Sequence, residues 1–207
     1  MIEAPVQFGT PALEETLQRV AERLRERNIE TIIVEDGEAA RAVVLERVPK
    51  GAQVWSARSK TLQDSGLFDA LHAPGEYDAL RPRAMKMDRK TQMPEIRKLL
   101  AAPDYMLGSV QAITEDGLLV TASASSSQLG PYATGAEKVI LVVGSQKIVP
   151  NLDAALQRIR EYALPWEDEQ VRKLGSSGSF VGKILIVERE QFAGRMAVIL
   201  VRQPIGI

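Results

Sequence analysis

A pair of carboxylates stands at the entrance of an apolar segment. Glu115 and Asp116 precede Gly117, and the apolar run Leu118–Val120 follows directly. A carboxylate that a tight turn fixes beside a cleft has the chemistry of a nucleophile or a general base. Asp-Gly is equally common in solvent-facing β-turns, where the pair would have no chemical role. Glu115 is therefore the candidate catalytic residue, and a plain surface turn is the alternative.

A loop of small residues, "ASASSSQLG", comes after this apolar run. Ser123, Ser125 and Ser126 offer hydroxyl groups, and their small size lets a ligand approach the backbone. A flexible surface loop is the competing interpretation. We include these serines among the candidate ligand-binding residues.

The segment "WSARSKTL" follows an expected strand and could hold an anion. Ser56, Ser59 and Thr61 supply hydroxyl groups, Lys60 supplies a charge, and the expected helix start adds backbone N–H groups. The alternative is that Ser59 or Thr61 only caps that helix.

A basic stretch, "RPRAMKMDRK", covers residues 81–90. Its cations are Arg81, Arg83, Lys86, Arg89 and Lys90. They could meet a phosphate-bearing ligand or RNA, but no aromatic residues interleave with them. We favour a solvated face and expect no nucleic-acid partner.

The composition narrows the chemistry further. The 207 residues include no cysteine and one histidine, and the formal net charge is -1. Without cysteine the chain holds no disulfide, thiol nucleophile or cysteine-ligated zinc or iron–sulfur centre, and we assign it no metal and no cofactor. The sequence shows no signal-peptide pattern and no apolar run near the ~18 residues of a membrane span. It therefore predicts a cytoplasmic protein without a membrane partner.

Alternating segments must position the candidate groups. An amphipathic pattern after Pro11 predicts a helix, residues 31–34 and 52–56 predict buried strands, and another helical pattern lies between the two strands. This alternation indicates an α/β fold, a mainly parallel sheet flanked by helices. We expect one domain over residues 1–207, with residues 1–50 as its N-terminal helical and strand portion.

The second half of the chain has shorter patterns. Residues 138–144 form the clearest strand pattern, and residues 109–114 predict one or two helical turns. A Gly/Ser-rich loop at residues 172–182 precedes two apolar runs, 183–188 and 196–201. A glycine-containing turn region separates these runs, which suggests an antiparallel hairpin.

Three segments together resemble the LUD-domain family, which includes lactate-utilisation protein C. They are "SARSKTLQDSGL", "YMLGSVQAITEDGLLV" and "KVILVVGSQKIVPNLDAALQRIREY". The likeness extends from about Gln53 to Val187. It implies a fold similar to that of glucosamine-phosphate deaminase (NagB), ribose-5-phosphate isomerase (RpiA) and CoA transferases.

The resemblance also implies roles for residues. Glu115 would project into a ligand cleft, with the serine-rich loop as a facing wall. Lys147, in the segment "G-x-x-K" after a strand, would be either a cleft cation or a surface residue. The implied ligand-binding residues are Ser56, Ser59, Lys60, Thr61, Gly108, Gly117, Ser123, Ser125, Ser126 and Lys147.

The function that the resemblance implies is a component of L-lactate utilisation, in which lactate is oxidised to pyruvate with iron–sulfur partner subunits. The chain would bind a small carboxylate or another small anionic ligand near Glu115, and it could form a homo-oligomer. Two alternatives stay open. One is a non-catalytic ligand-binding or assembly module, and the other is an enzyme that acts on a CoA ester or a small phosphorylated acid through Glu115.

Overall fold

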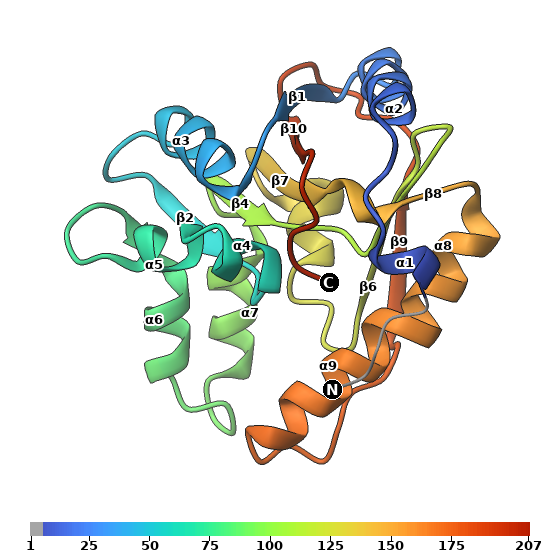
Figure 1. The fold of residues 1–207 in the computed structure, drawn as a ribbon. Helices are drawn as coiled ribbons and strands as arrows, with labels where there is room; N and C mark the ends of the chain where they lie inside the picture. Colours follow the sequence, from blue (N-terminus) through green and yellow to red (C-terminus); the bar gives the residue numbers. More distant parts are fainter. Residues whose placement is uncertain (1–5) are drawn as a thin grey trace.

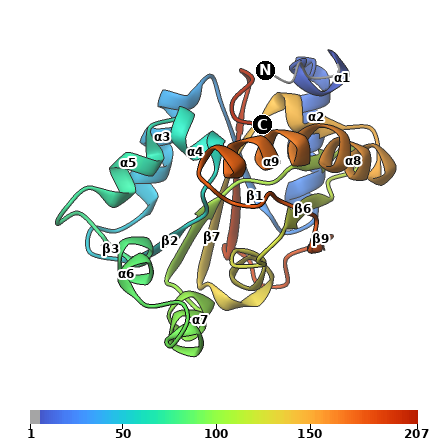
Figure 2. The same ribbon diagram turned by 90° about the horizontal axis from the view of Figure 1, so that it is seen from below.

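Six parallel strands form the central sheet of the structure, a computed structural model that describes residues 6–207. Their order across the sheet is β1-β10-β7-β4-β2-β3 (Figures 1 and 2). In this order the strands are Glu30–Val34, Met196–Val201, Lys138–Gly144, Tyr105–Gly108, Gln53–Ser56 and Asp78–Ala79. The predicted α/β fold with a mainly parallel sheet is confirmed.

Strand β7 shows why the centre of this sheet is apolar along its whole length. Val139, Leu141 and Val143 belong to the core on one face of the sheet, whereas Ile140 and Val142 belong to the core on the other face. Successive side chains of a strand point to opposite faces, so a strand that is covered on both sides has no polar position. The continuous run "VILVV" is the sequence signature of this location.

Helices cover both faces of the large sheet. The helices α3, α4 and α5 contribute to the core on one face, and α2, α6 and α7 contribute to the core on the other. In chain order these helices are α2 Glu14–Glu26, α3 Gly37–Arg47, α4 Lys60–Asp64, α5 Leu67–His72, α6 Leu80–Lys86 and α7 Met93–Ala101. A short helix, α1 (Val6–Gly9), precedes them. Among residues 6–207, no helix combines the length and the apolar character that a membrane span requires.

A second, four-stranded sheet packs on the α2 side of the large sheet. Its order is β8-β5-β6-β9, with strands Ile148–Val149, Ala112–Thr114, Leu119–Ser123 and Lys183–Val187. The helical turns predicted for residues 109–114 are wrong, because β5 pairs with β6 on one side and β8 on the other. This small sheet places the loop after β6 opposite the strand ends of the large sheet.

The antiparallel hairpin predicted near the end of the chain is also wrong. Strand β9 pairs with β6 in the small sheet, whereas β10 lies between β1 and β7 in the large sheet and is parallel to both. The glycine-containing turn region between β9 and β10 therefore connects two different sheets.

The outer face of the small sheet is covered by a long helical path. Helix α8 (Leu152–Arg158) continues through a π-helical turn (Ile159–Ala163) into α9 (Leu164–Lys173). Pro165 lies in the first turn of α9, where a missing backbone N–H is tolerated. The path carries α9 past the small sheet toward α6 and α7 (Figure 1). It thereby provides one wall of a cavity.

Candidate functional site

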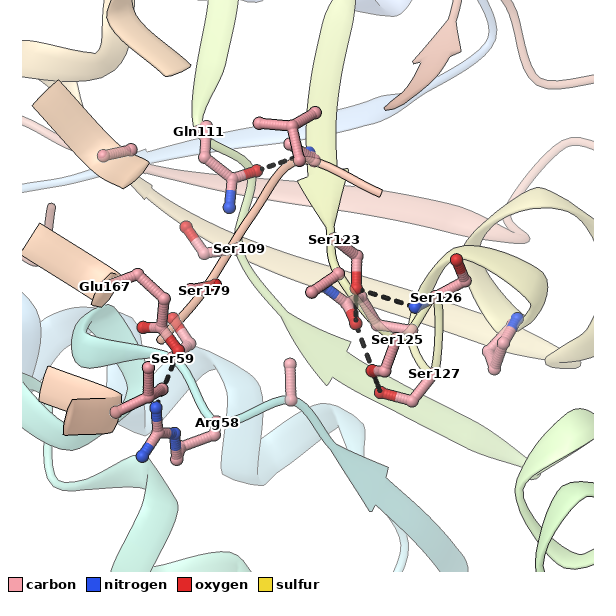
Figure 3. A pocket seen from close by; sticks show the side chains of 18 of the residues that line it. Arg58, Ser59, Ser109, Gln111, Ser123, Ser125, Ser126, Ser127, Glu167 and Ser179 are labelled. Carbon is pink, nitrogen blue, oxygen red and sulfur yellow. Dashed lines mark hydrogen bonds and ion pairs between the residues drawn. The ribbon is translucent and has the colours of Figure 1, made fainter. Parts of the chain in front are cut away.

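A cavity of about 1040 Å³ lies at the carboxyl ends of β2, β4 and β7. One wall comes from α6, α7 and the segment after β2, and the facing wall comes from α9 and residues 176–181. The serine-rich loop after β6 closes a further side (Figure 3). Ligand sites of parallel α/β sheets occur at this edge, where strands run into loops.

Lys147 is the buried cation of this cavity. Its Nζ donates hydrogen bonds to Thr61 Oγ1 at 2.8 Å and to Ser109 Oγ at 3.0 Å. Thr61, Ser109 and Lys147 follow β2, β4 and β7, so these two bonds join the ends of three adjacent strands. Lys147 is only 2% exposed, and the described part of the chain gives it no ion-pair partner. Its burial does not fit a surface residue, and the role of cleft cation stays a prediction.

The environment of Lys147 disfavours its charged form. Burial lowers the pKa of Lys147 well below its ordinary value, nearby Arg158 lowers it further, and Asp64 opposes both. Arg158 is also completely buried and donates to the backbone oxygens of Gln111 at 2.6 Å and Phe8 at 3.3 Å. Burial lowers the pKa of Arg158 to about 10. Lys147 lines the cavity and is bonded only to neutral groups, so an anion in the cavity would stabilise its charged form.

Further cations line the cavity beyond Lys147. Within the described residues 6–207, the lining contains six basic side chains and one acidic side chain, Glu167. The basic ones are Arg58, Lys60, Arg81, Arg89, Arg97 and Lys147. Glu167 pairs with Arg58 at 2.6 Å, which links the segment after β2 to α9 (Figure 3). Lys60 pairs with Asp64, its neighbour one helical turn along.

The serine-rich loop holds its own shape by local hydrogen bonds. The Ser123 hydroxyl donates to Gln128 Oε1 at 3.0 Å and accepts from the backbone N–H of Ser126 at 3.0 Å. Ser125 donates to Ser127 at 3.3 Å (Figure 3). Ser126 has a φ of 64°, and its buried hydroxyl finds no partner among residues 6–207. The loop is therefore an ordered wall with hydroxyl groups to offer.

The structure places Glu115 outside this cavity, which does not fit the expectation that it projects into the cleft. Its carboxylate pairs with Arg19 on α2 at 2.8 Å, and its side chain is 38% exposed. Gly117 lies in the same turn, where a φ of 93° favours glycine. The turn packs against α2 and precedes β6, whereas the serine-rich loop follows the other end of this strand.

Two more expected ligand residues are not in the lining. Ser56 is buried at the end of β2, and its hydroxyl contacts His72 Nε2 at 3.2 Å. Gly108 lies against the Tyr132 hydroxyl, which leaves no room for a side chain. Seven of the expected residues do line the cavity, namely Ser59, Lys60, Thr61, Ser123, Ser125, Ser126 and Lys147.

Sequence reasoning missed several lining residues. Arg81, Arg89 and Arg97 were expected on a solvated face or outside any site, and Ser176 and Ser179 were expected in a linker. Trp166, Glu167 and Ser109 had no assigned role. The excess of basic residues in 81–90 was the one sequence pattern that could have indicated this part of the lining. These residues face a cavity only because α6 and α7 pack beside the strand ends.

The fold and this cavity define an α/β protein with a cavity, lined by basic side chains, at the carboxyl edge of a parallel sheet. The chain belongs to the LUD family, because the model of the LUD domain matches residues 17–201. Its structure is similar to the crystal structure of a DUF162 family protein from Deinococcus radiodurans. The two have a TM-score of 0.54 and 13% identity over 90% of this chain and 96% of that one, a likeness of fold. A search of curated proteins finds no match.

Proposed function

We propose that the chain binds a small carboxylate, lactate or its oxidation product pyruvate, as a component of L-lactate utilisation. The LUD family is associated with lactate utilisation in general. The observation that carries the proposal is the buried Lys147 amine, which is held by two hydroxyls and has no carboxylate partner in the described chain. A ligand carboxylate would supply the missing charge.

The hydroxyl groups around Lys147 support the same ligand. Thr61 and Ser109 can turn their hydrogens toward a carboxylate while their oxygens still accept from Lys147. A charge-assisted hydrogen bond is roughly twice as strong as a neutral one. A 2-hydroxy or 2-oxo acid would also present an oxygen to one of these groups. The site thus suits a small acid that has a polar group beside its carboxylate.

Electron transfer would take place in partner proteins. The sequence contains no cysteine, so no cysteine-ligated iron–sulfur cluster can be built on this chain. We propose that iron–sulfur subunits accept the electrons and that this chain presents or senses the acid. A tagged form of the chain should then co-purify with iron-containing proteins, and purification without them from lactate-grown cells would contradict this part.

No observation favours the CoA-ester or phosphorylated-acid enzyme that would use Glu115 as nucleophile or base. The Glu115 carboxylate is paired with Arg19 and lies away from the cavity. A non-catalytic binding or assembly module would bind its ligand at the same cavity. This alternative differs from our proposal only in whether partner subunits oxidise the bound acid.

Calorimetric titration of the purified protein with lactate, pyruvate and lactamide tests the proposal. The acids should bind, and uncharged lactamide should bind at least about tenfold more weakly, because it lacks the charge that Lys147 compensates. The Lys147→Met variant should lose acid binding, and the matched control Glu115→Gln should keep it. Equal binding of lactamide, or loss of binding in Glu115→Gln alone, would overturn the proposed site.

A further inference from the structure

The cavity is much larger and more cationic than a three-carbon acid requires. Its volume of about 1040 Å³ is at the upper end of the range for small-molecule sites. Besides Lys147, five basic side chains line it, and Glu167, the one acidic side chain that residues 6–207 contribute to the lining, is already paired with Arg58. The basic residues near α6 and α7 therefore suit a second anionic group, separate from a carboxylate at Lys147.

Arg81 is the centre of this second region. Its guanidinium carbon lies 5.6 Å from the ring centre of Trp55 and 5.7 Å from that of Phe68. Its one hydrogen bond within residues 6–207 goes to the backbone oxygen of Ser56 at 3.3 Å. Contacts with two rings fix the plane of the guanidinium before any ligand arrives. Arg81 is thus oriented but not neutralised.

Neighbouring arginines add to the positive charge. Burial lowers the pKa of Arg81, and the nearby charges of Arg58 and Arg89 lower it further. Neither Arg89 nor Arg97 has an ion-pair partner in the described part of the chain. Like charges that crowd a concave surface cost free energy, which a ligand with several negative charges would recover.

The facing wall supplies aromatic surface. Trp166 on α9 and Phe180 in the loop before β9 both line the cavity, and Phe180 is 64% exposed. Aromatic side chains across a cavity from a cluster of arginines suit a ligand that has a planar ring and phosphate groups. A cavity with walls on two sides favours a small molecule over an RNA strand.

We propose that Arg81, Arg89 and Arg97 form a subsite for the phosphates of a nucleoside diphosphate or triphosphate, whose ring lies toward Trp166 and Phe180. Guanidinium groups match phosphate oxygens in a two-point geometry, and three of them suit two or more phosphates. The proposal goes beyond the carboxylate site at Lys147, and the two can be tested separately.

Titration with ADP, pyrophosphate and adenosine tests the subsite in the purified full chain. ADP should bind more tightly than pyrophosphate, and pyrophosphate more tightly than adenosine. Arg81→Gln should lower the affinity for ADP at least about tenfold, the usual effect of losing one charge-assisted hydrogen bond. Arg83→Gln is the matched control, because Arg83 is on the same helix, is paired with Asp78 and does not line the cavity.

Further variants keep the test independent of folding and of the carboxylate site. Arg97→Gln changes an exposed side chain, so this variant should fold even if Arg81→Gln does not. It should also lower the affinity for ADP. Lys147→Met should keep ADP binding while it loses lactate binding. If the unmodified chain binds ADP but neither lactate nor pyruvate, only the proposed function is refuted. No binding of ADP or pyrophosphate, equal losses in Arg81→Gln and Arg83→Gln, or binding of single-stranded RNA in place of ADP would overturn the subsite.

Discussion

Replacing Lys147 by methionine should make the ligand-free protein more stable while it abolishes acid binding. The change removes two hydrogen bonds to hydroxyls, each worth about 1 kcal/mol. It also removes the cost of burying an ammonium group, which is several kcal/mol after relaxation. Thr61 and Ser109 retain a contact with each other at 3.3 Å. The balance is a gain of about 2 kcal/mol, or a melting temperature about 4–8 °C higher for a chain of this size.

Urea unfolding followed by tryptophan fluorescence at neutral pH measures this difference. Lys60→Met is the control, because Lys60 also lines the cavity, next to Thr61, but is partly exposed and paired with Asp64. Its stability should change by less than about 1 kcal/mol. A lower midpoint for Lys147→Met would refute the reasoning and make Lys147 a structural link between three strands.

The pH dependence of this difference has a fixed sign. The pKa of Lys147 is lowered in the folded protein, so the unfolded chain binds the proton more tightly. The destabilisation by Lys147 is complete below the folded pKa and disappears as the pH rises toward the unfolded value near 10.4. The advantage of Lys147→Met should therefore shrink on the alkaline side.

Three other outcomes follow from the same structure. A bound carboxylate should raise the pKa of Lys147, so lactate binding should take up a proton at a pH above the pKa of Lys147 in the ligand-free protein. Calorimetry would show this uptake as a binding enthalpy that varies with the ionisation enthalpy of the buffer. No variation would mean that Lys147 is already charged before lactate binds. Gly108→Ala should lower stability by about 1–3 kcal/mol in urea unfolding, because a Cβ there would collide with the Tyr132 hydroxyl, and an unchanged midpoint would contradict the packing. Glu190→Gln should cost about 3–5 kcal/mol, since it leaves the buried Arg195 without its carboxylate at 2.6 Å, and a loss below 1 kcal/mol would show that the pair is solvated.

The fold was predictable where the signal was local. The alternation of helical patterns with runs such as residues 138–144 indicates a parallel sheet, because strands covered on both faces need continuous apolar sequence. The two errors concern segments that have at least one distant partner. Residues 112–114 are a strand only because β6 and β8 flank them, and β10 is parallel only because β1 and β7 leave a place between them.

The candidate site was predictable in part for the same reason. The end of an expected strand gave Ser59 and Thr61, since parallel strands end at one edge. The family resemblance gave Lys147. Glu115 was misplaced because its turn lies beside Arg19, a contact between residues far apart in sequence. Arg81 was expected on a solvated face because its aromatic neighbours, Trp55 and Phe68, come from other elements. The sequence of residues 81–90 contains no pattern that indicates these neighbours.

The position of β10 has a consequence for how the chain folds during synthesis. Strand β1 has no neighbour in its sheet except β10, so Glu30 must wait for Ala197 to be made before it can pair. Until then β7 also lacks its β10 partner and presents an unpaired apolar edge. Contacts of such long range slow folding and prolong the exposure of aggregation-prone strands. The order of strands therefore makes completion of the large sheet a late event, because β1 and β7 both wait for β10.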